Sequence, residues 1–125
     1  MRDSELQQLV EAWISLHHAD PDSEEHRNNF WAYGRMSELC SHDPELCWHA
    51  IHRVRRRDSS EVILANLASG PVEDLLATHG EGFIERVEKV ALEDEQFRRI
   101  LGAVWQNEID QPIWERIKAV AGSSW

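Results

Sequence analysis

The stretches LASGPVEDLLATHG (residues 67–80) and FRRILGAVWQN (residues 97–107) place helix ends and helix starts close together. Gly70 can end one helix while Pro71 opens the next, because proline is tolerated in a first helical turn. Gly80 is expected to stop the short helix that follows. Apolar residues between these signals recur at helical spacing. The region therefore predicts short helices that pack against one another with few residues between them.

The same helical period continues on both sides of this region. Ser23 is expected to cap a helix that runs to about Cys40, with Glu24 and Glu25 at its positive end. Further helix caps are expected at Asp43, Asp58, Asp94 and Asp110. No segment alternates with period two for long enough to predict a strand. We predict an all-α fold of about seven to eight short helices in antiparallel hairpins, like a compact helical-repeat array.

The charge balance argues against several classes of function. The 125 residues contain 23 Asp and Glu against 13 Lys and Arg, which gives a net charge of −10. This acidity disfavours binding to nucleic acids and to anionic membranes, because phosphates need clustered basic residues. A basic protein partner would instead be attracted to the surface.

Chain length, cysteine content and apolar runs predict the number of domains and the location of the protein. A chain of this length fits one domain, so residues 1–125 are expected to form a single unit with residues 60–107 as its core segment. The polar N-terminal sequence shows no signal peptide, and the apolar run at residues 62–68 is too short to span a bilayer. Cys40 and Cys47 do not suggest a disulfide framework, so we expect reduced thiols in a cytoplasmic protein.

Three motifs in residues 67–107 form a recognisable combination. They are a Gly-Pro-x-Glu-Asp-Leu-Leu helix start at Gly70–Leu76, a His-Gly helix end at His79-Gly80, and a Phe-Arg-x-x-Leu-Gly-x-Val-Trp run at Phe97–Trp105. In this order they resemble a family of small bacterial proteins of unknown function. The resemblance implies a bacterial source and an all-helical domain, and it carries no activity.

Glu73, Asp74 and His79 invite a catalytic interpretation that helix geometry does not support. At about 100° per residue, Asp74 and His79 lie roughly 140° apart around one helix. The simpler interpretation is that the two acids satisfy first-turn amides while His79 packs near the helix end. The functional alternative is a small-ligand-binding protein or enzyme, completed by residues one hairpin later. Its polar pocket would contain Glu73, Asp74, His79, Arg98 and Gln106, with Asn107 as a further candidate.

Two further clusters receive a structural interpretation. Glu45, His49 and His52 share one helical face and form the most metal-like set, but they lack an evident additional ligand. We therefore expect a solvated face with no metal and no cofactor, and a metal site there is the weaker alternative. The arginines of residues 53–57 form the only basic patch, and we expect them to pair with Asp58 and Glu61 at a helix end. No nucleotide-binding or hydrolase motif is present, which lowers the odds of an enzyme.

The tryptophans and the acidic residues suggest how the surface is used. Trp13, Trp105 and Trp114 fall on apolar faces and are expected in the core, whereas Trp31 and Trp48 sit beside polar residues as candidate interface anchors. The stretch 20–25 and the stripe Glu81, Glu85 and Glu88 are the acidic contact candidates. Our first hypothesis is a non-enzymatic protein–protein interaction module. Its sharper variant is an immunity or antitoxin-like protein that masks a basic toxin surface.

Overall fold

The chain folds into an array of helices without strands, as the sequence predicts. A computed structural model describes residues 1–125, of which 79% are helical. The elements are α1 (Asp3–His18), α2 (Glu24–Asn29), α3 (Trp31–His42), α4 (Pro44–Arg57), α5 (Glu61–Leu67), the π-helical turn η1 (Ala68–Val72), α6 (Glu73–Glu93), α7 (Glu95–Gly102) and α8 (Gln111–Val120). Because α2 runs on into α3, and α5 runs through η1 into α6, they join into six rods instead of the seven to eight helices predicted.

Most of the predicted helix caps are present. Three side chains accept a hydrogen bond from the amide three residues further on, at 3.1, 3.3 and 3.1 Å: Ser23, Asp43 and Asp94. Each satisfies one of the free N–H groups of a first helical turn. Asp110 precedes α8 as expected, but its side chain makes no capping hydrogen bond.

The cap predicted at Asp58 is wrong by two residues. Asp58 accepts a hydrogen bond from the amide of Ser60 at 2.9 Å, and Ser60 is the residue from which α5 begins. A side chain that bonds to the amide two residues on closes an Asx turn, which precedes a helix instead of capping it. The carboxylate of Asp58 also contacts His18 Nε2 at 2.8 Å, so this turn ties α4 to the end of α1.

Gly70 and Pro71 do not separate two helices as expected. Both lie in η1, whose wider turn joins α5 directly to α6. A proline inside an α-helix lacks an N–H and its ring collides with the carbonyl four residues earlier. A turn with hydrogen bonds five residues apart accommodates this ring, so a bulge takes the place of the predicted break.

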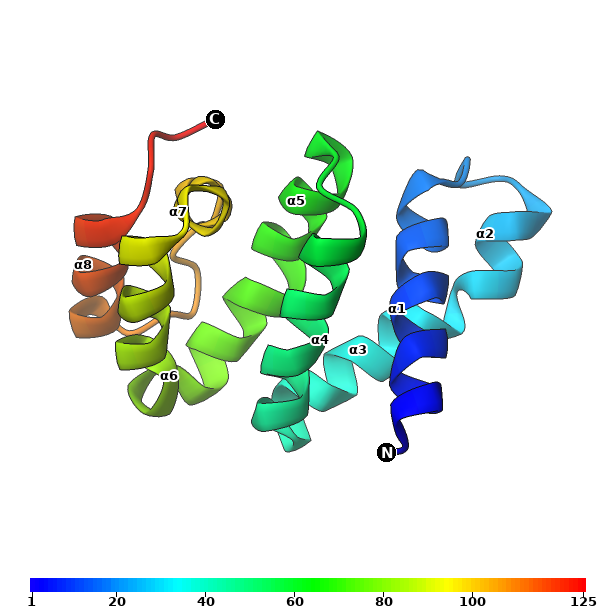
Figure 1. Cartoon of the computed structure of the whole chain (residues 1–125), viewed down its shortest axis with the longest axis horizontal. Helices are drawn as coiled ribbons and strands as arrows, with labels where there is room; N and C mark the ends of the chain where they lie inside the picture. The colour runs from blue at the N-terminus through cyan, green and yellow to red at the C-terminus, as the bar shows by residue number, and fades with distance from the viewer.

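The helix expected to stop at Gly80 bends there instead. His79 has non-helical backbone angles (φ −129°, ψ 23°) inside α6, and Figure 1 shows the chain turning sharply in the middle of that element. Gly80 is buried, and a Cβ at this position would lie 3.1 Å from Cγ2 of Ile113 in α8. The glycine therefore permits close contact between the bend and α8.

The helices form a row from one end of the molecule to the other. In Figure 1, α1, α4 and the second half of α6 stand side by side, with α2 at one end of the row and α8 at the other. A single cluster of 30 buried side chains runs through the row, including Leu9 of α1, Ile63 of α5 and Ile117 of α8. Cys40 and Cys47 are free and buried within it. None of the helices is both long and apolar enough to cross a membrane.

The expected burial of the tryptophans holds only in part. Trp13 is 2% exposed, whereas Trp105 is 74% exposed and does not belong to the core. The reason is that α7 ends at Gly102, so the helical spacing that placed Trp105 on the inner face no longer applies. Trp114 in α8 packs half-buried against the core.

Candidate functional site

The structure does not bring the predicted pocket residues together. Asp74 lines a cavity between α1, α3 and η1, while His79, Arg98 and Gln106 each line a different cavity. The four side chains therefore have no common space in which a ligand could touch them all. Glu73 does meet Asn107 from one hairpin later, whose side-chain amide donates to Glu73 Oε2 at 3.0 Å.

Local hydrogen bonds hold three of these side chains where they are. The contacts are His79 Nε2 with the carbonyl of Ser41 at 2.9 Å, Arg98 to the carbonyl of Ala91 at 2.7 Å, and Gln106 to the carbonyl of Ile109 at 3.2 Å. Each contact occupies a group that the pocket would have needed. The three residues thus stabilise the joints between helices.

The metal-like set on α4 is divided between separate partners. Both terminal nitrogens of Arg86 donate to the carboxylate of Glu45, at 2.6 and 2.8 Å, and these bonds lower the pKa of Glu45. His52 Nδ1 accepts a hydrogen bond from Arg55 Nε at 2.9 Å. No three His, Cys, Asp or Glu side chains gather around a common point.

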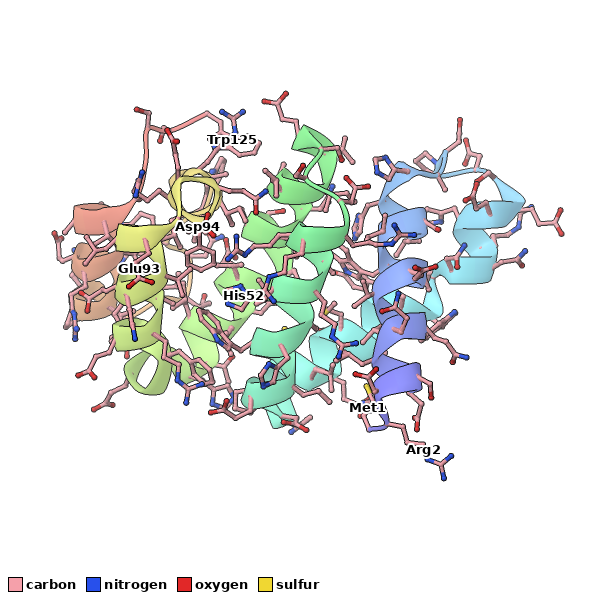
Figure 2. All side chains as sticks on the ribbon, viewed as in Figure 1. Met1, Arg2, His52, Glu93, Asp94 and Trp125 are labelled. Carbon is pink, nitrogen blue, oxygen red and sulfur yellow. The ribbon has the colours of Figure 1, made fainter.

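A hollow lies along the outer face of α4. It has a volume of about 1010 Å³ and is bordered by the start of α1 and the end of α6. Figure 2 shows His52 between α4 and α6 with Glu93 and Asp94 beyond it, and Met1 and Arg2 on the other side of α4. Buried Arg55 donates to Asp94 at 2.8 Å, to Gln96 at 3.0 Å and to His52.

Three of the four arginines of residues 53–57 are paired, but with other acids than expected. Its ion pairs join Arg53 to Asp3, Arg55 to Asp94 and Arg57 to Glu11. The predicted partners face elsewhere, because Asp58 contacts His18 and Glu61 contacts Arg99. These ion pairs join α4 to α1 and to the start of α7, whereas Arg56, which also lines the hollow over α4, has no ion pair.

Three aromatic side chains stand uncovered at the junction of α2 and α3. Phe30, Trp31 and Tyr33 are 54%, 51% and 57% exposed, and the rings of Phe30 and Tyr33 stack in parallel with 5.7 Å between their centres. Ala32 and Met36 hold the same helix in the core. We call Phe30, Trp31 and Tyr33 the aromatic surface.

Only part of this surface could be predicted from the sequence. Trp31 is exposed, as expected of an interface anchor, but Phe30 and Tyr33 were missed. The available signal was that apolar residues of this segment occupy most of the helix circumference, so that some of them must face outward. Trp48, the other proposed anchor, is half-buried and packs against His52 with 4.3 Å between ring centres.

Acidic side chains lie immediately before the aromatic surface. Asp20, Asp22, Glu24 and Glu25 are all exposed around the start of α2. A helix rises about 1.5 Å per residue, so Glu24 and Phe30 lie about 9 Å apart along the axis of α2. On the stripe of α6, Glu81 and Glu85 are exposed. Glu88 accepts a hydrogen bond from Arg116 Nε at 2.9 Å, and hydrogen bonding to Arg116 lowers the pKa of Glu88.

These features define an all-helical protein in which the predicted polar pocket is not assembled and an uncovered aromatic surface lies next to acidic residues. The chain belongs to the family of unknown function DUF6869, whose model matches residues 19–124. The match includes the aromatic surface and residues 67–107. Comparison with curated proteins and with solved structures finds no match.

Proposed function

We propose that this protein is a non-enzymatic interaction module that binds a basic protein through the aromatic surface and the acids of residues 20–25. The observation that carries the proposal is the exposure of Phe30, Trp31 and Tyr33, each by more than half of its surface. Large aromatic side chains that gather uncovered on a soluble protein mark binding sites. Trp and Tyr are also the residues that most often dominate binding energy at interfaces.

The charge around the surface supports a basic partner. Four acids precede the three aromatic residues within a segment of 14 residues, from Asp20 to Tyr33, and Arg27 is the only Arg or Lys among them. The whole chain carries a net charge of −10, which would steer a basic protein toward it. An ordinary interface covers about 800 Å² of each partner, enough to include both groups. An immunity or antitoxin-like role is the variant in which the basic partner is a toxin.

The second acidic candidate is less well placed. The stripe Glu81, Glu85 and Glu88 lies on the second half of α6, toward the α8 end of the row, whereas α2 lies at the opposite end (Figure 1). Arg116 already neutralises Glu88. No aromatic group comparable to the aromatic surface has been found beside this stripe, so we place the contact at the α2–α3 junction.

The test is quantitative capture of partners from source-cell lysate with four versions of the protein. We expect the specific partner to be basic, and Trp31→Ala to weaken its binding about 30-fold, as for a hot-spot residue. Glu24→Lys with Glu25→Lys should reduce binding and its salt dependence. Trp105→Ala is the matched control, because Trp105 is an exposed tryptophan far along the chain from this surface. An acidic partner, or equal loss with Trp31→Ala and Trp105→Ala, would refute the proposal.

A further inference from the structure

A small polar cavity opens beside the aromatic surface. It has a volume of about 220 Å³ and is lined by side chains of α1, α3, α5, η1 and the start of α6. Pockets that hold drug-sized ligands span about 300–1,000 Å³, so this one suits a smaller group. Tyr33 belongs both to the cavity wall and to the aromatic surface.

The one ionised group in the lining is an acid without a partner. Asp74, at the start of α6, lies partly open to solvent, makes no ion pair and accepts no hydrogen bond from another residue. Partial burial, followed by the charge of Glu73, raises the pKa of Asp74. No lysine or arginine lines the cavity. A cation entering it would supply the partner that Asp74 lacks.

Two other polar groups of the lining, Asn66 and Ser69, keep free hydrogen-bond acceptors. Asn66 already donates its side-chain N–H to the carbonyl of Val62 at 2.8 Å, which leaves Oδ1 as an acceptor. The hydroxyl of Ser69 donates to the carbonyl of Ala65 at 3.1 Å, which leaves the lone pairs of its oxygen free to accept a hydrogen bond. A ligand that meets these two acceptors and the carboxylate of Asp74 carries hydrogen-bond donors.

The remaining walls are uncharged and partly aromatic. Trp13 and Tyr33 line the cavity, and the ring of His17 packs against Trp13 with 4.2 Å between the ring centres. Burial, together with the nearby His26 and His18, lowers the pKa of His17, so its imidazole is neutral at neutral pH. Aromatic faces attract cations, and a neutral imidazole does not repel them.

We propose that this cavity binds an alkylammonium group, with Asp74 as its counter-ion and with Trp13 and Tyr33 as its aromatic walls. The ammonium supplies three N–H donors for the acceptor groups, and its alkyl stem fits the narrow cavity. The group comes either from a small aliphatic amine or from a lysine side chain of a protein. In the lysine form the inference rests on the proposed function, because the lysine then belongs to the basic partner.

The experiment is an NMR titration of the full chain with n-butylamine, which is charged at neutral pH, and with n-butanol as its neutral counterpart. We expect n-butylamine to shift the indole signal of Trp13 and the side-chain amide signals of Asn66 in a saturable way, and n-butanol to leave them in place. Asp74→Asn should weaken n-butylamine binding about tenfold or more, as the loss of a charged hydrogen-bond partner does. Glu73→Gln is the matched control, because it removes the adjacent charge, which faces Asn107 and does not line the cavity, and should change affinity less than about threefold.

A peptide with one lysine, compared with the same peptide carrying norleucine, distinguishes the two sources. Tighter binding of the lysine peptide than of n-butylamine assigns the site to a protein lysine, and the reverse order assigns it to a free amine. Trp31→Ala, which tests the proposed function, should leave n-butylamine affinity unchanged, so the two proposals fail separately. Equal binding of n-butanol, unchanged affinity in Asp74→Asn, or displacement of n-butylamine by micromolar Ca²⁺ would overturn the alkylammonium site.

Discussion

Replacing Asp94 tests the network that ties α4 to α7. Asp94 accepts a hydrogen bond from Arg55 at 2.8 Å and caps α7 by accepting one from the amide of Phe97 at 3.1 Å. The Arg55 side chain is 7% exposed and that of Asp94 33%. Removing the acid therefore leaves a nearly buried guanidinium whose remaining side-chain acceptors are Gln96 and His52.

The two roles of Asp94 can be separated with two substitutions. Asp94→Ser keeps a side-chain oxygen that can cap the helix but removes the charge, and we expect it to lower the free energy of unfolding by about 2 kcal/mol. This is less than for a fully buried pair, because a third of the Asp94 side chain meets solvent. Asp94→Ala loses the cap as well, and we expect it to lower the free energy of unfolding by about 3 kcal/mol in total. Arg55→Met should cost about 1 kcal/mol, because the exposed side of the carboxylate can be hydrated.

Urea unfolding followed by circular dichroism measures these differences. Desolvation raises the pKa of Asp94, but the hydrogen bonds from Arg55 and Phe97 outweigh it, so the pKa lies below its usual value. The stabilisation is thus fully present above the unfolded pKa of about 3.9 and is lost as pH falls through the lower folded pKa. The gap between wild type and Asp94→Ser should accordingly close in strong acid. A gap below about 0.5 kcal/mol at pH 7, or a greater cost for Arg55→Met than for Asp94→Ser, would refute this account.

Three other features give shorter predictions. Burial, and then the neighbouring guanidinium, lower the pKa of His52 to about 4, so the unfolded chain takes up a proton first as pH falls below about 6.5. Stability should therefore drop by up to about 3 kcal/mol between pH 6.5 and 4, and His52→Asn should flatten this dependence in urea unfolding. A Cβ at Gly102 would collide with the carbonyl of Ser123, so Gly102→Ala should expose the C-terminal segment to limited proteolysis, while Gly82→Ala, which meets nothing within 4 Å, should not. Phe97 is fully buried, and Phe97→Ala should cost about 3–5 kcal/mol in thermal or urea unfolding.

Helix starts were predictable because their signals are local. Asp43 and Asp94 each cap a helix by bonding to an amide three residues away, so the whole interaction lies within one turn of sequence. Pro44 predicted the start of α4 for the same reason, since proline favours the first position of a helix and Pro44 occupies that position in α4. Nothing further along the chain is needed to form such a contact.

Helix joints were less predictable because packing decides them. Pro71 alone favours a break, but Leu67, Val72 and Leu75 around it are all buried. Continuing the helix through η1 keeps these side chains on one face toward the core, which offsets the cost of the missing N–H. At Phe30, by contrast, α2 runs on into α3 although α2 buries no residue and the side chain at the junction is exposed.

The pocket could not be predicted because its walls come from helices far apart in the sequence. Asp74 was identified from the sequence as a candidate, but its neighbours in the cavity are His17 of α1 and Tyr33 of α3, not Arg98 or Gln106. The spacing of residues within one helix fixes which side chains share a face. It contains no information on which other helix will cover that face.

Glu73 and Asp74 illustrate how adjacent acids acquire different roles. Consecutive helical residues point about 100° apart, so the two carboxylates at the start of α6 face different neighbours. Glu73 turns toward Asn107 in the segment before α8 and is hydrogen-bonded to it. Asp74 turns toward α1 and α3, where the lining offers aromatic rings and acceptor groups but no donor that binds it. Glu73 gains a partner on folding, whereas Asp74 loses part of its hydration without gaining one. That difference is why the ligand is expected at Asp74 and why Glu73→Gln is the appropriate control.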